Sequence, residues 1–383
     1  MTFAHKIVRV CEELAKMSEE PGLTTRTFLS PPMHKVHRYL RSWMSDFSIK
    51  THVDAAGNLR GLYGDPSKPR LIIGSHLDTV PDAGAFDGIL GVVLGIAIAA
   101  VEPRLAIEII GFSEEEGVRF GKPFIGSRAL VGDTEWGDPE ILQAISEFGL
   151  DPAQLPAARF SPNTIGYLEI HIEQGPVLDR LGLRLGVVEA IAGQSRFELT
   201  FHGRANHAGT TPMGAREDAL VAAARWIIDV ERYGASIPGL VATVGSIQVR
   251  PNAVNVIPGE VQASLDVRHA KDNERRAAAR HLLMLAQTPH KLLLNQKTVR
   301  MDRSLTQTLA NSVRAAGFPV HRMASGAGHD AMIVAPHIPS AMLFVRSPGG
   351  LSHHPAESVH ENDVDAALET GITFVDRLAR QHA

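Results

Sequence analysis

The chain has 383 residues, 44% of them apolar and 21% charged, so it is long enough for two folded domains rather than one core. Its 38 basic and 42 acidic residues give a net charge of −4, which provides no general field for nucleic acid or for an anionic membrane. The single cysteine, Cys11, excludes internal disulfides and CxxC zinc sites, so any metal is expected on imidazole and carboxylate groups.

The amino-terminal stretch mixes apolar residues at helical spacing with charged ones, unlike a signal peptide. The longest nearly uncharged apolar run covers residues 88–101, and this is shorter than the roughly 20 residues that a membrane-spanning helix needs. We therefore expect a cytoplasmic protein without membrane or nucleic-acid partners.

Two helices are expected first, over residues 4–18 and 32–45, and then a pair of short strands between residues 49 and 62. Residues 71–96 are typical of a buried strand, a Pro/Gly loop and a helix. In an open α/β sheet, such a turn at the carboxyl end of a strand is where ligands and catalytic groups collect. His76, Asp78 and Asp87 fall there. Taken alone, the His-x-Asp pattern of His76 and Asp78 is explained more often by a core or surface position.

The next two predicted strands also lead to residues that can bind metal. Residues 105–112 run directly into the glutamates at 114–116, and the strand at 166–175 alternates so that His171 lies opposite its apolar face. Taken alone, three glutamates are typical of a solvated turn, and His171 could be a structural histidine. In a pair of carboxylates at a strand end, one can instead bind metal while its neighbour acts as general base.

A separate unit is predicted between residues 195 and 302, where the pattern changes to βαββαβ. Its expected elements are strands 196–203, 240–249, 255–269 and 290–299 and helices 216–233 and 272–286. We therefore predict one domain from residues 1–194 and 303–383 and a second, inserted α+β domain from residues 195–302.

The chain then returns to the first domain with a helix at 305–316 and strands at 320–323 and 341–345. The last strand opens into a glycine-rich loop with His353, and a helix at 361–378 closes the chain. Donor residues thus lie on or just beyond the strand ends of one proposed sheet. They are His76, Asp87, Glu116, His171 and His353.

Five donors exceed the three that a mononuclear catalytic zinc usually takes, so they suit two divalent ions that share a carboxylate. Zinc, manganese, cobalt and nickel all accept imidazole and carboxylate ligands. The expected reaction class is hydrolysis of a polarised C–N bond. The sequence has no GxSxG, HExxH or GxxxxGK[ST] motif that would favour another chemistry.

Several motifs occur in the order GSHLDTVPDAGAFDG, SEEEG, EIHIEQG, HAGTTPMGAR, RPNAVNVIPG with DVRH, SGAGHDA and LSHHPAE. Together they resemble the dinuclear metal amidohydrolases of the M20 peptidase superfamily. The similarity is greatest to its ureido-hydrolysing branch of allantoate amidohydrolases, N-carbamoyl-L-amino-acid hydrolases and β-ureidopropionases. The resemblance implies an α/β, zinc-peptidase-like catalytic domain with a mixed sheet and an inserted lid and dimerisation domain.

The resemblance also implies a role for each metal ligand. Asp87 would bridge two divalent ions. One ion would be bound by His76 and His171, and the other by Glu116 and His353. Peptidases of this superfamily commonly have a carboxylate at the position of His171, so the histidine favours carbamoyl or ureido substrates over peptides.

Two acidic residues beside the ligands receive catalytic roles by the same resemblance. Glu115 would be the general base, and Asp78 would orient His76. The expected activity is removal of an N-carbamoyl or ureido group from a small carboxylate, with release of ammonia and carbon dioxide. Allantoate and N-carbamoyl-L-amino acids are the chief candidates.

The inserted domain would supply His207 to stabilise the tetrahedral intermediate and Asn255 and Arg268 to hold the substrate carboxylate, for which the arginine fork is suited. Gln174 and His329 are expected to be further substrate contacts. In this family the lid residues act in the site of the partner subunit, so a homodimer is implied.

Two alternatives stay open. The chain could be an M20 aminoacylase or dipeptidase. It could also be a non-catalytic dimeric homologue that binds a carboxylate ligand, although this reading predicts loss of Glu115 or of several ligands, and all are present.

Overall fold

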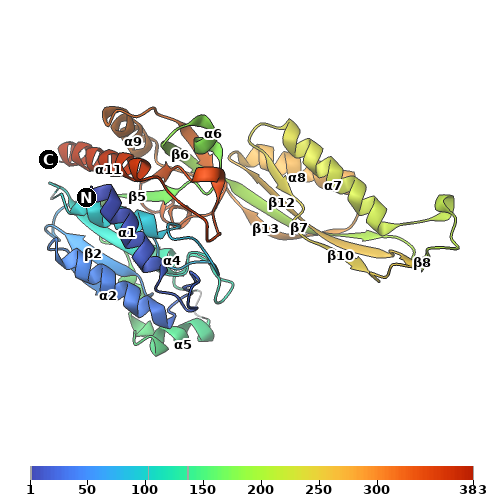
Figure 1. The fold of residues 1–383 in the computed structure, drawn as a ribbon, viewed down its shortest axis with the longest axis horizontal. Helices are drawn as coiled ribbons and strands as arrows, with labels where there is room; N and C mark the ends of the chain where they lie inside the picture. Colours follow the sequence, from blue (N-terminus) through green and yellow to red (C-terminus); the bar gives the residue numbers. More distant parts are fainter. Residues whose placement is uncertain (1, 102, 136–137, 383) are drawn as a thin grey trace. The chain divides into compact units, whose positions relative to one another are not determined.

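The computed structural model describes residues 2–101, 103–135 and 138–382. The chain forms two compact units (Figure 1), which are described one at a time. The first consists of Met1–Glu189, Arg300–Met323 and Ala327–Ala383, and the second of Ala190–Val299 and Ala324–Gly326. Among the described helices, none has both the length and the apolarity needed to cross a bilayer.

The first unit is built on a mixed sheet with the strand order β1-β2-β4-β3-β5-β16-β6-β14, and β15 pairs with β6. The strands are β1 Lys50–Val53, β2 Leu59–Tyr63, β3 Arg70–His76, β4 Ala106–Phe112, β5 Thr164–Ile172, β6 Leu185–Ile191, β14 Val299–Arg300, β15 Arg322–Ser325 and β16 Ser340–Val345. The neighbours β4, β3, β5 and β16 are parallel, so their carboxyl ends share one edge of the sheet. The predicted α/β class is confirmed.

The helices of this unit, with the 3₁₀ segments η1 and η3, are α1 Phe3–Ala15, α2 Pro31–Ser45, α3 Ile89–Ala99, α4 Ile125–Val131, α5 Pro139–Glu147, η1 Pro152–Ala158, α6 Val177–Leu181, α9 Arg303–Ala315, α10 Ala331–Val334, η3 Pro348–Gly350 and α11 Glu361–Gln381. Every residue of α3 is buried, as expected for a helix that is apolar on all sides. It packs on β3, β4 and β5 and is covered by α1 and α11. This packing holds β3 and its carboxyl end in the core.

The strand β5 is buried on both of its faces. Leu168 and Ile170 belong to the main hydrophobic core with α3. On the opposite face, the carboxylate of Glu169 accepts a hydrogen bond of 2.7 Å from the backbone N–H of Ala331 in α10. His171 shares this second face by alternation, so its predicted orientation away from the apolar face is confirmed.

The sequence prediction missed β6 and merged some strands. Ala192 alone separates β6 from the next strand, so no run of turn residues marks the boundary. In the second unit, the predicted strand at 240–249 is broken near Gly245, and the one at 255–269 is broken at Pro258 and Gly259. Each of these two predicted strands is therefore two shorter ones.

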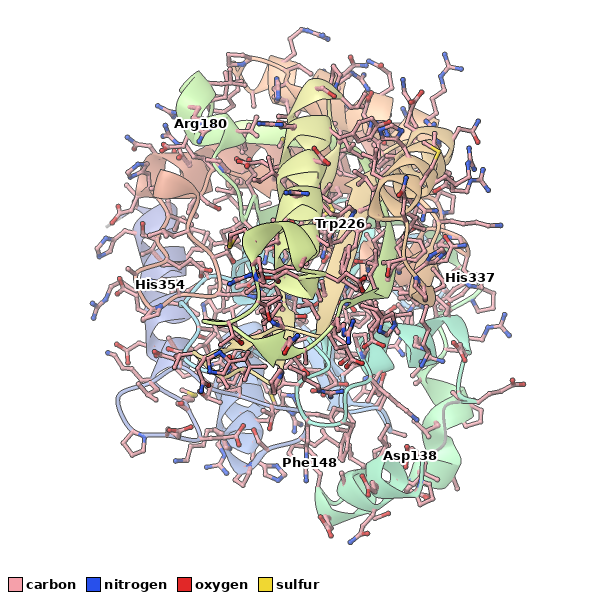
Figure 2. The ribbon with its side chains drawn as sticks, turned by 90° about the vertical axis from the view of Figure 1, so that its right-hand side faces the viewer. Asp138, Phe148, Arg180, Trp226, His337 and His354 are labelled. Carbon is pink, nitrogen blue, oxygen red and sulfur yellow. The ribbon has the colours of Figure 1, made fainter. Side chains whose placement is uncertain are left out.

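The second unit has a sheet with the order β10-β12-β7-β13, and β9 pairs with β12. A two-stranded ribbon, β8 with β11, is separate from this sheet. Trp226 on α7 (Figure 2) donates a hydrogen bond of 2.9 Å from Nε1 to the carbonyl oxygen of Leu282 on α8, which joins the two helices over the buried face of β12. The elements are β7 Gly193–His202, β8 Asn206–His207, η2 Met213–Ala215, α7 Ala219–Ser236, β9 Val241–Thr243, β10 Ile247–Arg250, β11 Val256–Ile257, β12 Glu260–His269, α8 Asp272–Ala286 and β13 His290–Gln296.

Gly91 lets α3 approach the sheet closely. A Cβ atom at this position would overlap the backbone carbonyl oxygen of Ile170 and lie 2.8 Å from Cβ of Ser75. We expect Gly91→Ala to lower the free energy of unfolding by about 2 kcal/mol or more, because backbone must move. The matched control is Gly95→Ala on the same helix, whose nearest contact is a side-chain methyl of Ile73 at 3.0 Å and which should cost less. Equal urea midpoints for the two variants would contradict this account.

Candidate metal centre

The predicted ligands come together at the carboxyl edge of the parallel strands. His76 is the last residue of β3, His171 is near the end of β5, Glu116 follows β4 and His353 follows β16. Asp87 lies in the loop between β3 and α3. All five therefore belong to the first unit, and groups of them have donor atoms within 4.8 Å of one another.

One group consists of His76, Asp87 and His171, all of which are buried. Nε2 of His171 lies 3.3 Å from Nε2 of His76 and 3.2 Å from Oδ1 of Asp87. Nε2 of His76 lies 3.8 Å from the same carboxylate oxygen. The three donor atoms form a small triangle that we call the inner triangle.

A second group shares Asp87 and adds Glu116 and His353. Nε2 of His353 lies 3.2 Å from Oδ2 of Asp87 and 3.4 Å from Oε1 of Glu116. We call this group the outer triangle. Asp87 directs one oxygen to each triangle, which is the arrangement that a bridging carboxylate requires.

The two triangles have the size of a metal coordination shell. Ligand atoms at about 2.1 Å from a tetrahedral zinc ion are about 3.4 Å from each other. The edges measured here are 3.2–3.8 Å. The donors therefore fit divalent cations without rearrangement of the backbone.

The protonation of the inner histidines also favours a cation. Nδ1 of His171 lies 2.9 Å from the carbonyl oxygen of Ile172, and Nδ1 of His76 lies 3.0 Å from that of Asp78. A carbonyl oxygen can only accept, so each Nδ1 carries a proton. Burial lowers the pKa of His171 to about 4, so the ring is neutral near pH 7. Its Nε2 therefore carries a lone pair, and this lone pair faces the carboxylate of Asp87. A lone pair and a carboxylate repel each other unless a cation lies between them.

The carboxylates around His76 create a strongly negative pocket. Burial alone would lower the pKa of His76, but the charges of Glu115, Asp78, Asp87 and Glu116 outweigh it and raise that pKa well above its usual value. The pocket therefore stabilises positive charge, which is the property that a metal site needs.

Glu115 lies beside both triangles. Its donor atoms are within 4.8 Å of those of His76 and Glu116, and its side chain is buried. Burial raises the pKa of its carboxyl group well above the usual value, and the charges of Glu116 and Asp330 add to the effect. A carboxyl group with a raised pKa accepts a proton more readily than an ordinary glutamate and can return it, as general base and acid work requires.

Asp78 positions the glutamates more directly than it positions His76. Its Oδ1 and Oδ2 accept hydrogen bonds of 3.0 Å from the backbone N–H groups of Glu115 and Glu116. The carboxylate is 3.8 Å from Nδ1 of His76, which instead contacts the Asp78 carbonyl oxygen at 3.0 Å. Asp78 thus links the loop after β3 to the loop after β4.

The first glutamate of the triplet is structural. Glu114 accepts hydrogen bonds from the backbone N–H groups of Phe28, at 3.0 Å, and Arg119, at 2.9 Å. Its backbone φ of 52° is in the left-handed region, and so are those of Gln174 (59°) and His353 (54°). Non-glycine residues adopt this conformation rarely and at a cost, and it clusters at functional sites.

Glu357 is a residue of the centre that the sequence analysis missed. Its Oε1 accepts hydrogen bonds of 3.0 Å from the backbone N–H groups of both Phe86 and Asp87, and its Oε2 accepts one of 3.2 Å from Ser352. It therefore holds the loop of Asp87 against the loop of His353. The available signal was its place in the LSHHPAE motif.

The remaining predicted residues of this unit are adjacent to the triangles. The amide nitrogen of Gln174 donates to both oxygens of Asp87, at 3.1 and 3.2 Å, and lies 3.4 Å from Nε2 of His353. The buried ring of His329 packs edge-on to His171 with centroids 4.5 Å apart. The neighbouring His354 instead accepts a hydrogen bond from Ala356, so His353 is the histidine at the outer triangle.

The predicted residues of the second unit do not form one cluster there. His207 and Asn255 lie close together, because β8 and β11 pair through His207 and Val256. Arg268 lies near the other end of β12, eight residues beyond Glu260, which corresponds to roughly 25 Å along a strand. Its guanidinium donates to Asp266, at 2.9 and 3.2 Å, and to the carbonyl oxygen of Gly326, at 2.7 Å.

Comparisons with known proteins identify the family of the chain. Residues 72–381 match peptidase family M20/M25/M40. The chain is 37% identical to allantoate deiminase 1 of Glycine max over 96% of this chain and 88% of that protein, and 35% identical to N-carbamoyl-L-amino acid amidohydrolase of Geobacillus stearothermophilus over 96% and 97%. A crystal structure of a hydantoinase/carbamoylase family amidase from Burkholderia multivorans superposes with a TM-score of 0.89 at 30% identity and covers 98% of both chains.

The family match extends over most of the chain, and the curated relatives align along nearly all of it. These relatives and the sequence motifs place it near the allantoate and N-carbamoyl-L-amino-acid amidohydrolases. The chain belongs to the M20/M25/M40 peptidase family.

Proposed function

We propose that this chain is a metal-dependent amidohydrolase that hydrolyses the C–N bond of an N-carbamoyl or ureido carboxylate and releases ammonia and carbon dioxide. Allantoate and N-carbamoyl-L-amino acids are the preferred substrates. The observation that carries the proposal is the pair of donor triangles that share Asp87, with Glu115 beside them. The names of the amidohydrolase relatives support the substrate class.

The ligand set proposed is His76 and His171 for one divalent ion, Glu116 and His353 for the other, and Asp87 for both. Divalent cations held there, zinc or manganese foremost, would polarise the substrate carbonyl group and acidify water. This is the chemistry that hydrolysis of an unactivated C–N bond needs.

The side chains of the protein then move the proton. Glu115 takes a proton from the attacking water, the water oxygen bonds to the carbonyl carbon, and the C–N bond breaks. Glu115 returns the proton to the leaving nitrogen, so that ammonia departs and a carbamic acid stays on the other nitrogen. The carbamic acid then loses carbon dioxide by breaking its remaining C–N bond, and its proton moves to the nitrogen to give the free amine. Asp78 keeps Glu115 and Glu116 in place through their backbone N–H groups.

We further propose that two copies of the chain share each site. Arg268 is roughly 25 Å along β12 from Glu260, and His207 and Asn255 lie at the separate ribbon of β8 and β11 that comes before this strand. We infer that this is too far for all three to contact one small substrate. A homodimer resolves this, since one subunit supplies Arg268 and the other supplies His207 and Asn255. Cross-linking and sedimentation should therefore detect a dimer.

The direct test is ammonia release by purified protein loaded with manganese or zinc. We expect turnover of allantoate or of an N-carbamoyl-L-amino acid, and loss of this activity after dialysis against a chelator with recovery when metal is returned. Faster turnover of N-acetyl amino acids or dipeptides would overturn the substrate assignment. Full activity in chelator would overturn the metal assignment.

Arg268 is expected to bind the substrate carboxylate. Arg268→Ala should raise KM by about 10- to 100-fold with a smaller effect on kcat, because a charge-assisted hydrogen bond to substrate is lost. Arg196→Ala is a matched control, because Arg196 also donates to Asp266, at 2.7 Å, but has no proposed contact with substrate. Equal KM changes in the two variants would assign Arg268 a purely structural role.

A further inference from the structure

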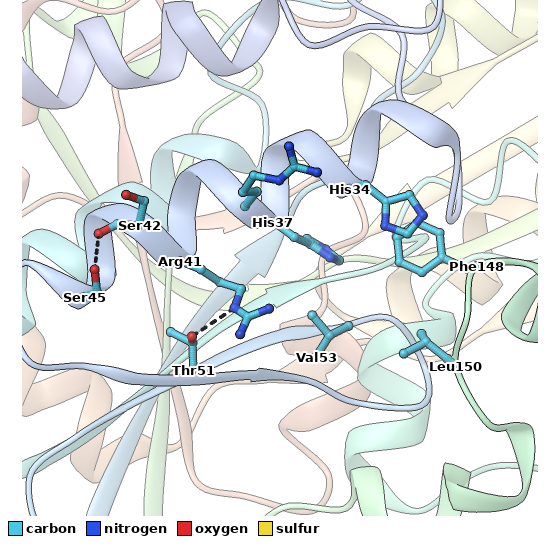
Figure 3. Close-up of a pocket in the computed structure, with 10 residues that line it drawn as sticks. His34, His37, Arg41, Ser42, Ser45, Thr51, Val53, Phe148 and Leu150 are labelled. Carbon is cyan, nitrogen blue, oxygen red and sulfur yellow. Dashed lines mark hydrogen bonds between the residues drawn. The ribbon is translucent and has the colours of Figure 1, made fainter.

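A hollow of about 750 Å³ lies beside α2 in the first unit and shares no residue with the metal centre (Figure 3). Its lining comes from α2, from β1 and from the segment that follows α5. A volume of 300–1,000 Å³ is typical of pockets that bind small molecules. The lining chemistry indicates which molecule fits.

Two arginines on α2 give the hollow a positive charge. Arg38 and Arg41 are both exposed, and within the described residues neither guanidinium has a carboxylate within 4 Å. Nε of Arg41 donates to Oγ1 of Thr51 at 3.1 Å, which leaves its terminal amino groups available. None of the lining residues is acidic, whereas the chain as a whole has a net charge of −4. The charge here is thus suited to an anion.

Apolar side chains also line the hollow. Val53, Phe148 and Leu150 form what we call the apolar wall, and each is half-buried. The ring of His34 is stacked on Phe148 with centroids 3.7 Å apart and planes within 3°, which fixes the orientation of the phenyl ring (Figure 3).

A buried polar group in the lining also lacks a partner. His37 is 5% exposed, and its Nε2 has no hydrogen-bond partner among the described residues. Its ring meets Phe148 edge-on at 5.9 Å. Burial lowers the pKa of His37 to about 3, so the ring is neutral and offers a hydrogen bond rather than a charge. A buried polar atom without a partner costs free energy, and His37 borders the hollow.

We propose that this hollow binds a small organic anion with a flat ring. The phosphate or carboxylate group is held by Arg38 and Arg41, and the ring lies against the apolar wall. Arginine is suited to this because its planar fork binds two oxygens of such a group. The site is separate from the metal centre, so its occupancy does not depend on the proposed hydrolytic function.

Calorimetric titration of the whole protein with phenyl phosphate tests the proposal. We expect a dissociation constant of about 1 mM or below for phenyl phosphate. Inorganic phosphate has the anionic group without the ring, and benzyl alcohol has the ring without the anionic group, so each should bind at least about tenfold more weakly. The double variant Arg38→Gln/Arg41→Gln should also weaken binding by about tenfold or more. Arg314→Gln, which changes an exposed arginine on α9, should leave binding unchanged.

A metal centre also attracts an anion such as phenyl phosphate. A variant of the metal centre therefore shows whether the ligand binds there or in the hollow. Asp87→Asn should leave binding intact if the ligand occupies the hollow. Binding that is lost in Asp87→Asn but kept in the double arginine variant would overturn the proposal. So would an absence of binding up to about 5 mM, or equally tight binding of inorganic phosphate.

Discussion

Replacing Glu115 by glutamine is expected to lower kcat by about 10²- to 10⁴-fold, which is the usual contribution of a general base. The substitution keeps the shape of the side chain and removes its ability to accept and return a proton. Backbone hydrogen bonds from Glu115 and Glu116 to Asp78 do not involve the altered group, so the loop should stay in place. Steady-state ammonia release measures the effect.

Metal content distinguishes this role from that of a ligand. Glu115→Gln should keep both metal ions, measured by elemental analysis, and should bind substrate with a dissociation constant near the wild-type KM. The exposed Glu147→Gln on α5 is the matched control and should retain full activity. Loss of metal together with activity would make Glu115 a ligand, and retained turnover would exclude it as the base.

The main features of the centre could be predicted because they depend on local sequence. Runs of branched apolar residues that stop at a polar one identify the ends of β3 and β4, and alternation identifies the face of His171. Parallel strands then bring their carboxyl ends to one edge. The three glutamates at 114–116 were ambiguous alone, and the burial of Glu114 and Glu115 after β4 excludes a solvated turn.

The role of Glu357 was missed because it depends on contacts between distant parts of the chain. Glu357 bonds to Phe86 and Asp87, which are about 270 positions away, and no periodic pattern reports such a contact. The separation of Asn255 from Arg268, in contrast, could have been predicted. A predicted strand over residues 255–269 already placed the two residues near its opposite ends. That length was a signal that one small substrate could not reach both residues within one chain.

Glu357→Ala is expected to weaken metal binding by about 10- to 100-fold, the usual cost of losing a group that supports metal ligands. The backbone N–H groups of Phe86 and Asp87 would be buried without their acceptor, at a cost of about 1–3 kcal/mol, and the loop of Asp87 would loosen. Because Asp87 serves both triangles, both ions should be affected. Metal titration followed by ammonia release measures this.

Excess metal separates a positioning role from a general loss of structure. We expect kcat of Glu357→Ala to recover largely at saturating manganese, since the ligands themselves remain. Glu357→Gln should lose less affinity, because its amide oxygen can still accept from both N–H groups. Glu369→Ala on the exposed side of α11 is the control and should match the wild type. If activity does not return at saturating metal, or if the glutamine variant is as impaired as the alanine variant, Glu357 does more than hold the Asp87 loop in place.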